Sequence, residues 1–140
     1  MFKYIMLIFL FVFSSNLIAQ DNGLPVGKVF RKRERLNYNQ AYIKAEQDKL
    51  PLLVIVGSSW CGPCIELKQE IIPKMEENKK LDSVVVTFVD VDEEEKLASQ
   101  LMSTNTVPQV IFFKRKTKGW NRKHLIGKQS EETIENLIKG

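Results

Sequence analysis

Apolar residues recur with different periods along the chain, and each change of period predicts a new helix or strand. Over residues 38–45 the apolar side chains fall on one face of a helix, and Asn37 before them is a plausible N-cap. Mainly apolar runs rich in β-branched residues predict strands at residues 52–56, 84–91 and 109–113. This alternation is typical of an α/β fold in which helices cover the faces of a sheet.

Three further helices are expected after the first. The second starts at Cys61, the third at Asp92 or Glu93, and the last follows its N-cap Ser130. Because a proline inside a helix removes a hydrogen bond and clashes with the preceding turn, Pro73 should kink or end the regular part of the second helix.

The third strand is expected to belong to a hairpin. A basic turn over residues 114–121 would lead into a return strand over residues 122–126, and Gly127 then breaks the chain before the last helix. The predicted order is helix, strand, helix, strand, helix, strand, strand, helix.

Residues 1–20 have the pattern of a secretory signal peptide. Lys3 precedes an apolar run over residues 4–13, which is too short to span a bilayer as a stable helix. We expect cleavage near Ala19 or Gln20. Retention as an N-terminal membrane anchor is the alternative, because apolar residues continue weakly beyond the main run. No cysteine lies near the cleavage position, which excludes lipid attachment there.

Residues 21–36 form a predicted N-terminal extension, and residues 37–140 form one predicted domain. The extension ends in a basic run over residues 31–35, which we interpret as a solvated linker or edge strand, or as a contact surface for acidic partners or anionic lipid. A hydrophobic content of 44% is ordinary for one domain with an adequate core. The formal charge of +4 is mild, and we expect no nucleic-acid partner.

Cysteine occurs only twice, within the sequence WCGPC at residues 60–64. A disulfide between such close neighbours constrains the unfolded chain little, so it would be a poor structural staple. Thiol–disulfide exchange explains the pair better. A zinc site would require more ligands than the two cysteines and His124 supply, and we expect neither a metal nor another cofactor.

The position of the pair at a strand–helix junction predicts different roles for the two thiols. Cys61 would lie at the helix N-terminus, where unpaired N–H groups and the helix dipole favour the thiolate and make it the nucleophile. Cys64, one turn into the helix and more buried, would stay protonated and resolve the mixed disulfide. Gly62 permits the tight turn, Pro63 suits the first helical turn, and Trp60 offers a flat apolar contact.

The chain resembles the thioredoxin superfamily over residues 37–140. The sequence at residues 60–64 is the thioredoxin active-site pentapeptide, and Gly127 fits a family glycine. The resemblance implies the thioredoxin fold, with a central mixed sheet flanked by helices on both faces. It also implies a cis bond between Val107 and Pro108, opposite the disulfide, with the Val107 backbone pairing with an extended substrate segment. The expected substrate-binding residues are Trp60, Gly62, Pro63, Val107 and Pro108.

Two buried positions depart from the family pattern. Ile55 stands where thioredoxins carry a buried aspartate, and Phe88 stands where they usually carry its lysine partner. The usual proton acceptor for Cys64 is therefore missing, and desolvation should make this thiol harder to deprotonate. Glu66 is the nearest carboxylate in sequence, but its helical position predicts that it faces solvent. Gln69 occupies the place of the family's kink proline.

These features predict an exported, monomeric thiol–disulfide oxidoreductase that acts on protein thiols and disulfides. The Gly-Pro pair between the cysteines resembles reducing thioredoxins, so we expect the reducing direction. In an oxidising compartment a reductase has to be recharged, and we expect a membrane electron donor. The segment between Cys64 and Pro108 has little room for the insertion of the cytochrome c maturation proteins, and the chain has no inserted helical domain like that of the periplasmic dithiol oxidase.

Two alternatives stay open. The same pair can serve a dithiol oxidase or isomerase, because residue types do not fix the direction of electron flow. A non-catalytic thioredoxin-fold binding module would instead hold a partner with the basic residues at 114–118 and Trp120, although a solvated hairpin tip is the plainer interpretation. The intact cysteine pair favours an enzyme.

Overall fold

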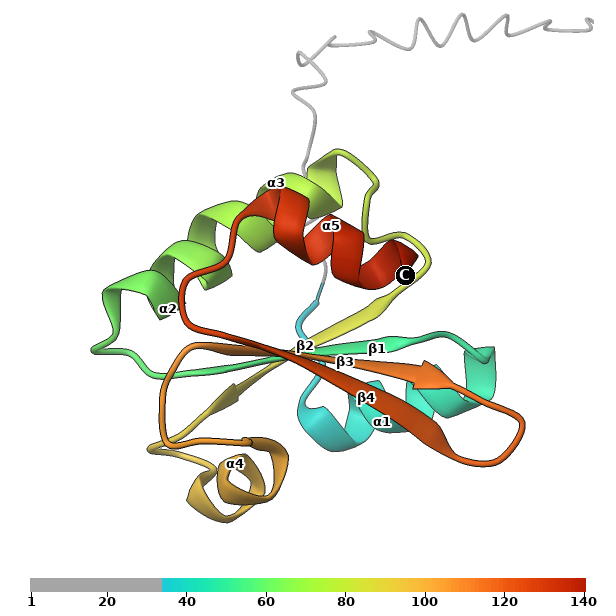
Figure 1. Cartoon of the computed structure of the whole chain (residues 1–140), viewed down its shortest axis with the longest axis horizontal. Coiled ribbons are helices and arrows are strands. Elements are labelled where there is room, and N and C mark those ends of the chain that lie inside the picture. The colour runs from blue at the N-terminus through green and yellow to red at the C-terminus, as the bar shows by residue number, and fades with distance from the viewer. Residues whose placement is uncertain (1–33) are drawn as a thin grey trace, which may run out of the picture. The chain divides into compact units, whose positions relative to one another are not determined.

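A four-stranded sheet forms the centre of the fold. Its strands span Leu52–Gly57 (β1), Val85–Asp90 (β2), Gln109–Arg115 (β3) and Trp120–Ile126 (β4). The computed structural model describes residues 34–140, so the predicted signal peptide and most of the predicted extension lie outside the described residues. The strand order is β2-β1-β3-β4 (Figure 1). Because β1 pairs in parallel with β2 while β3 is antiparallel to both its neighbours, the expected mixed sheet is confirmed.

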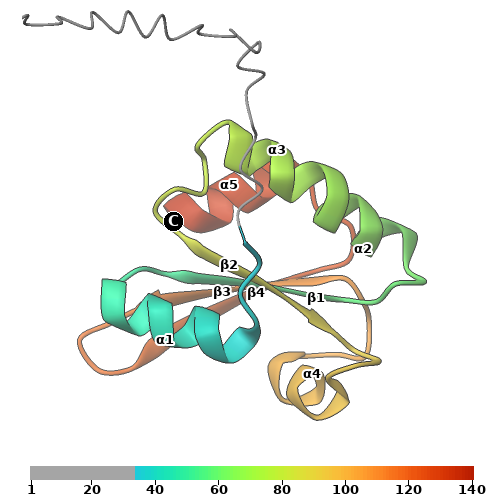
Figure 2. The ribbon, with the colours of Figure 1, turned by 180° about the vertical axis from the view of Figure 1, so that it is seen from behind.

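Helices cover both faces of this sheet, as expected. α1 (Tyr38–Asp48) and α4 (Glu95–Leu101) lie on one face (Figure 1, Figure 2). The opposite face carries α5 (Glu131–Lys139) and one long helical segment that consists of α2 (Gly62–Glu66), the π-helical turn η1 (Leu67–Ile71) and α3 (Ile72–Glu77). No helix within residues 34–140 is long and apolar enough to cross a membrane.

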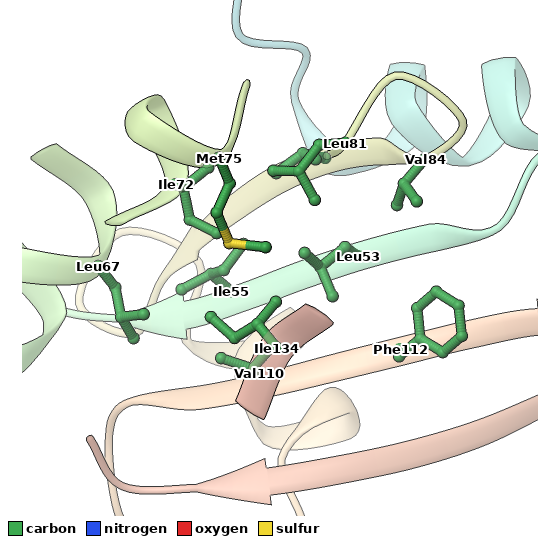
Figure 3. Packing of buried hydrophobic residues seen from close by; sticks show 11 residues of the cluster. Leu53, Ile55, Leu67, Ile72, Met75, Leu81, Val84, Val110, Phe112 and Ile134 are labelled. Carbon is green, nitrogen blue, oxygen red and sulfur yellow. The ribbon is translucent and has the colours of Figure 1, made fainter. Parts of the chain in front are cut away.

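Two hydrophobic clusters hold the layers together, because alternate strand residues point to opposite faces. Leu53 and Ile55 belong to the cluster beneath the long helical segment and α5, which Figure 3 shows from close by. Leu52 and Val54 belong to the cluster on the side of α1 and α4. Full burial of one such aliphatic side chain contributes about 1.5–3 kcal/mol to stability. β1 is therefore buried on both faces, as its unbroken apolar sequence predicts.

The chain enters the domain through contacts with β2 and with the first helix. Asn37 caps α1, and its side chain accepts the N–H of Gln40 at 3.0 Å, which confirms the predicted N-cap. Leu36 forms a parallel bridge with Thr87, whose hydroxyl donates to the Leu36 carbonyl at 2.8 Å. The last residues of the predicted extension thus pack on the domain. The boundary between the extension and the domain stays a prediction.

The second helix continues past Pro73, but its regular α-helical hydrogen bonding is interrupted before this proline. The π-helical turn lies immediately before this proline, and the N–H of Ile72 donates to the carbonyl of Leu67. A proline lacks an N–H and clashes with the carbonyl four residues earlier. The π-turn changes the hydrogen-bond register at that point, and the helix then runs on to Glu77.

The third helix begins later than predicted, at Glu95 rather than at Asp92 or Glu93. The residues after β2 first form a turn around Asp90. Its side chain accepts the N–H of Asp92 at 2.9 Å, and its carbonyl accepts the N–H of Glu94 at 2.8 Å. Asp92 and Glu93, at which the helix was predicted to begin, therefore belong to this turn.

The hairpin turn is shorter than the predicted turn over residues 114–121. β3 extends to Arg115, and the return strand begins at Trp120 rather than at Arg122. Arg115 and Trp120 are the last paired residues, and the connection passes through Gly119 with a φ of 77°. A left-handed backbone favours glycine, so this residue sets where the chain reverses.

Candidate active site

The cysteine pair lies where β1 passes into the long helical segment. Cys61 is the N-cap of α2 and forms a disulfide with Cys64, with the two Cα atoms 5.2 Å apart. The Cys61 sulfur also accepts the backbone N–H of Cys64 at 3.3 Å. Pro63 lies in the first helical turn, where its missing N–H costs no hydrogen bond. The sequence therefore predicted this local geometry correctly.

The surface around the disulfide is exposed on one side. Trp60 is 69% exposed, and Gly62 and Pro63 are also exposed. Cys61 is 8% exposed and Cys64 is 5% exposed, so both cysteines are largely buried. Exposed residues therefore flank the two cysteines, of which only a small part reaches the surface.

The indole of Trp60 has a polar partner that the sequence did not reveal. Its Nε1–H donates to Oδ2 of Asp92 at 2.8 Å. Asp92 lies in the turn after β2, far from Trp60 in sequence. The bond fixes the ring beside the disulfide and leaves its apolar face exposed. An acidic run directly after a central strand was the available signal, but nothing in the sequence connected it to Trp60.

Cys64 packs directly against Gly57, the last residue of β1. A Cβ built on Gly57 would lie 2.8 Å from the Cβ of Cys64 and 3.0 Å from its sulfur. Neither atom can move far, because Cys64 is held by the helix and the disulfide. The strand thus needs glycine at this position for the helix to approach it.

Val107 and Pro108 are joined by a cis peptide bond, as the resemblance implied. The pairing of β1 with β3 ends at Val56 and Gln109. Pro108, the residue before Gln109, therefore lies at the end of the sheet where β1 leads to Cys61. The Pro108 carbonyl accepts the N–H of Gly127 at 2.8 Å. The structure thus brings Pro108 to the cysteine end of β1. The substrate-binding roles of Val107 and Pro108 stay predictions.

Gln109 holds the loop that precedes this proline, a role that the sequence analysis missed. Its side chain is fully buried. The amide nitrogen donates to the carbonyls of Thr104 and Thr106 at 2.7 and 3.0 Å, and the amide oxygen accepts the N–H of Ser103 at 3.1 Å. The only sequence signal for this role was a polar residue at the start of an apolar strand. The partners of Gln109 lie in an irregular loop, whose conformation the hydrophobic pattern does not predict.

The positions beneath the cysteines are apolar, as the sequence predicted. Ile55 and Phe88 are register partners on β1 and β2. Glu66 forms an ion pair with Lys128 at 2.7 Å and is partly exposed, which agrees with its expected position toward solvent. The guanidinium of Arg35 lies 4.7 Å from the centroid of the Phe88 ring. Ile55 and Phe88 therefore offer Cys64 no carboxylate, and the carboxylate of Glu66 is paired with Lys128.

His124 lies on β4, away from the cysteine pair. Its register partner is Ile111, and both ring nitrogens are covered without a hydrogen-bond partner in the part of the chain that the structure describes. Burial, with a smaller contribution from the charge of Arg122, lowers the pKa of His124 below its usual value. Within residues 34–140 no group of His, Cys, Asp and Glu side chains is arranged to hold a metal ion.

The comparison with known proteins agrees with this geometry. The sequence model of the thioredoxin-like family matches residues 34–114. The chain belongs to the thioredoxin superfamily. It is 35% identical over 101 residues to a thioredoxin of Alicyclobacillus acidocaldarius subsp. acidocaldarius, which covers 71% of this chain and 85% of that protein. It is 28% identical over 114 residues to thioredoxin H-type 1 of Nicotiana tabacum, which covers 81% and 84%.

A solved structure shows the same fold. The solution structure of a thioredoxin from Thermus thermophilus matches with a TM-score of 0.62 at 20% sequence identity, over 74% of this chain and 82% of that one. Membership of the thioredoxin superfamily and the Cys61–Cys64 disulfide together support thiol–disulfide exchange as the chemistry of this site.

Proposed function

We propose that this protein is an exported thiol–disulfide oxidoreductase that reduces disulfides in partner proteins. One observation carries the exchange chemistry: Cys61 caps the helix, its sulfur accepts the Cys64 N–H at 3.3 Å, and the neighbouring residues Trp60, Gly62 and Pro63 are exposed. The backbone N–H and the helix dipole both stabilise negative charge on that sulfur. Cys61 is therefore the better nucleophile of the pair.

The reaction proceeds in two exchange steps. The Cys61 thiolate attacks one sulfur of a substrate disulfide, that disulfide breaks, and one substrate thiolate leaves and takes up a proton. The Cys64 thiol then loses its proton and attacks the Cys61 sulfur. The mixed disulfide breaks, the second substrate thiolate is released, and the Cys61–Cys64 disulfide remains. Two electrons have passed from the protein to the substrate.

The exposed surface around the pair suits a protein substrate. Trp60 and Pro63 give a flat apolar contact next to Cys61, and Trp60 is fixed by Asp92. The Val107–Pro108 segment lies at the cysteine end of the sheet, where its backbone can pair with an extended substrate segment. We propose Trp60, Gly62, Pro63, Val107 and Pro108 as the substrate-binding residues.

Export and direction rest on the sequence. The pattern of residues 1–20 supports secretion with cleavage near Ala19 or Gln20, and the Gly-Pro pair supports reduction. A reductase that works in an oxidising compartment needs a source of electrons, for which we propose a membrane donor. Cell fractionation with N-terminal mass analysis tests export. An uncleaved chain in the cytoplasm would contradict it.

A purely binding role finds less support. It relies on Trp120 and the basic hairpin residues, but the Trp120 indole donates to Glu46 of α1 at 2.8 Å, and Arg115 pairs with the same carboxylate. Trp120 is half-buried and its ring lies 6.2 Å from that of Tyr42. These two residues therefore hold the hairpin against α1 within the fold.

Reduction of insulin by dithiothreitol tests the enzyme directly. The wild-type protein should accelerate the precipitation of the insulin B chain, and the Cys61→Ser variant should not. Equal acceleration by Cys61→Ser, or none by the wild type, would contradict the proposal. The Ser99→Ala variant, which changes an exposed helix residue, is a suitable control.

A further inference from the structure

Cys64 has to lose a proton before it can resolve a mixed disulfide, yet the strand positions beneath it cannot accept one. Ile55 and Phe88 face each other there and carry no ionisable group. Because burial disfavours a thiolate, deprotonation of Cys64 without an acceptor would be slow near neutral pH. The acceptor has to come from another part of the site.

A cavity of about 350 Å³ lies beside Cys64, and Ile55 and Phe88 form part of its lining. It is large enough to hold several water molecules. Ser58 also lines it, is 6% exposed, and its hydroxyl has no hydrogen-bond partner in the described part of the chain. A buried hydroxyl without a partner normally bonds to water. The cavity therefore has a polar anchor for water next to the second cysteine.

Asp90 reaches the same cavity from the end of β2. Its register partner is Gly57, and it lies two residues beyond Phe88, so it shares the sheet face of Phe88. Gly57 carries no side chain that could separate Asp90 from Cys64. One carboxylate oxygen of Asp90, Oδ1, accepts the Asp92 N–H, and Oδ2 forms no hydrogen bond with any residue that the structure describes.

We propose that Asp90 accepts the Cys64 proton through water that Ser58 holds in this cavity. The proposal rests on the thiol–disulfide exchange described above. The Cys64 S–H bond breaks, and its proton passes through the water to the Asp90 carboxylate. The sulfur electron pair attacks the Cys61 sulfur, the bond between Cys61 and the substrate sulfur breaks, and the substrate thiolate leaves. Asp90 afterwards releases the proton to solvent. When the disulfide is reduced again, Asp90 takes up a proton from solvent and passes it through the same water to the departing Cys64 thiolate.

The other charged groups at the cavity are less well placed for this role. Glu93 and Glu94 belong to the turn after β2, Glu93 is exposed, and the backbone of Glu94 is held by the Asp90 carbonyl. Lys68 reaches the cavity from η1, with its ammonium 5.8 Å from the centroid of the Phe88 ring. Asp92 contributes only its backbone N–H to Asp90 and directs its carboxylate to Trp60. Asp90 alone is fixed by strand pairing opposite Gly57.

Single-turnover kinetics separates the two exchange steps. The reduced full chain is mixed with an excess of a peptide that contains one disulfide, and acid-quenched samples are analysed by mass spectrometry for the mixed disulfide and its resolution. In Asp90→Asn, attack by Cys61 should keep its rate. Resolution near neutral pH should slow by about 10²-fold, the usual contribution of a positioned acid–base group. The mixed disulfide should then accumulate.

The pH profile distinguishes proton transfer from a structural effect. The resolution rate of Asp90→Asn should rise with pH up to ionisation of the thiol itself, without the plateau of the wild type. The matched control Glu93→Gln should behave as wild type. Ile55→Asp, which places a carboxylate in the cavity lining, should restore resolution when combined with Asp90→Asn.

The outcomes for the two proposals differ. If the mixed disulfide forms and Asp90→Asn resolves it with the wild-type rate and pH profile, the role of Asp90 is overturned while the exchange reaction stands. If the wild type does not reduce the peptide disulfide at all, both fail. Should Asp90→Asn not fold, Ser58→Ala gives the second test: slower resolution supports the water path, and an unchanged rate and profile overturn it.

Discussion

Gly57 and Cys64 face each other at van der Waals contact, so that even one methyl group on Gly57 would lie 2.8 Å from the Cβ of Cys64. This contact sets how closely the active-site helix approaches β1. Gly57→Ala should therefore destabilise the oxidised protein by about 1–3 kcal/mol, as overpacking of a tight site does. Urea unfolding of the disulfide form measures the change.

Gly62→Ala is the matched control for that prediction, because a Cβ at Gly62 would meet no atom within 4 Å. Gly62 has no left-handed backbone either, so alanine should cost little stability there. Equal effects of the two substitutions would show that the contact between Gly57 and Cys64 does not limit the packing.

Gln109 ties the loop before Pro108 to the sheet, and its loss should affect both stability and substrate binding. Gln109→Met keeps the volume but leaves the N–H of Ser103 and the carbonyls of Thr104 and Thr106 without their buried partner. We expect a loss of about 1–3 kcal/mol in the free energy of unfolding. In the insulin assay, KM should rise more than kcat falls.

The control for Gln109 is Gln129→Met, because Gln129 also donates to backbone carbonyls but is less buried. A Gln109→Met protein with wild-type stability and wild-type KM would mean that the loop keeps its position without this side chain.

His124 should make the stability depend on pH in mildly acidic solution. Its pKa in the folded protein is lowered from 6.5, mainly by burial, so below pH 6.5 the unfolded chain binds a proton that the folded protein does not. Stability should therefore fall as the pH drops from 6.5 toward the folded pKa, and His124→Leu should lack this fall. Urea unfolding across this range measures it.

The titration itself can be read without ambiguity, because His124 is the only histidine in the chain. NMR of its ring protons should show a midpoint below 6.5 in the folded protein. A midpoint at or above that value would contradict the burial of its ring nitrogens.

The direction of electron flow is tested by the reduction potential of the Cys61–Cys64 couple. A reductase predicts a value near that of thioredoxin, about −270 mV, and an oxidase a value near about −120 mV. Equilibration with glutathione buffers, followed by alkylation of free thiols, gives the potential. A value near about −120 mV would contradict the reducing direction and favour the oxidase.

The sequence predicted most of the fold because the signals are local. The apolar run of β1, the caps Asn37 and Ser130 and the strand–helix junction at Cys61 each depend on nearby residues. The predicted start of α4 was wrong because the side chain of Asp90, in the preceding strand, holds the chain in a turn.

The parts of the site that the sequence missed depend on partners distant along the chain. The bond from Trp60 to Asp92 joins a loop to a turn on another strand. Gln109 acts through the conformation of an irregular loop. The absence of a carboxylate at position 55 could be seen in the sequence, but the proximity of Asp90 to Cys64 follows only from the register of β1 with β2 and from the cavity between them.

The central claim is that Cys61 attacks and Cys64 resolves, and covalent trapping tests it most directly. Each single serine variant is incubated with a peptide disulfide, and the adduct is located by mass spectrometry. Cys64→Ser should hold a stable mixed disulfide on Cys61, which is the N-cap of α2, and Cys61→Ser should form little adduct on Cys64. An adduct on Cys64 that forms as fast as that on Cys61, or no adduct on either, would contradict the account.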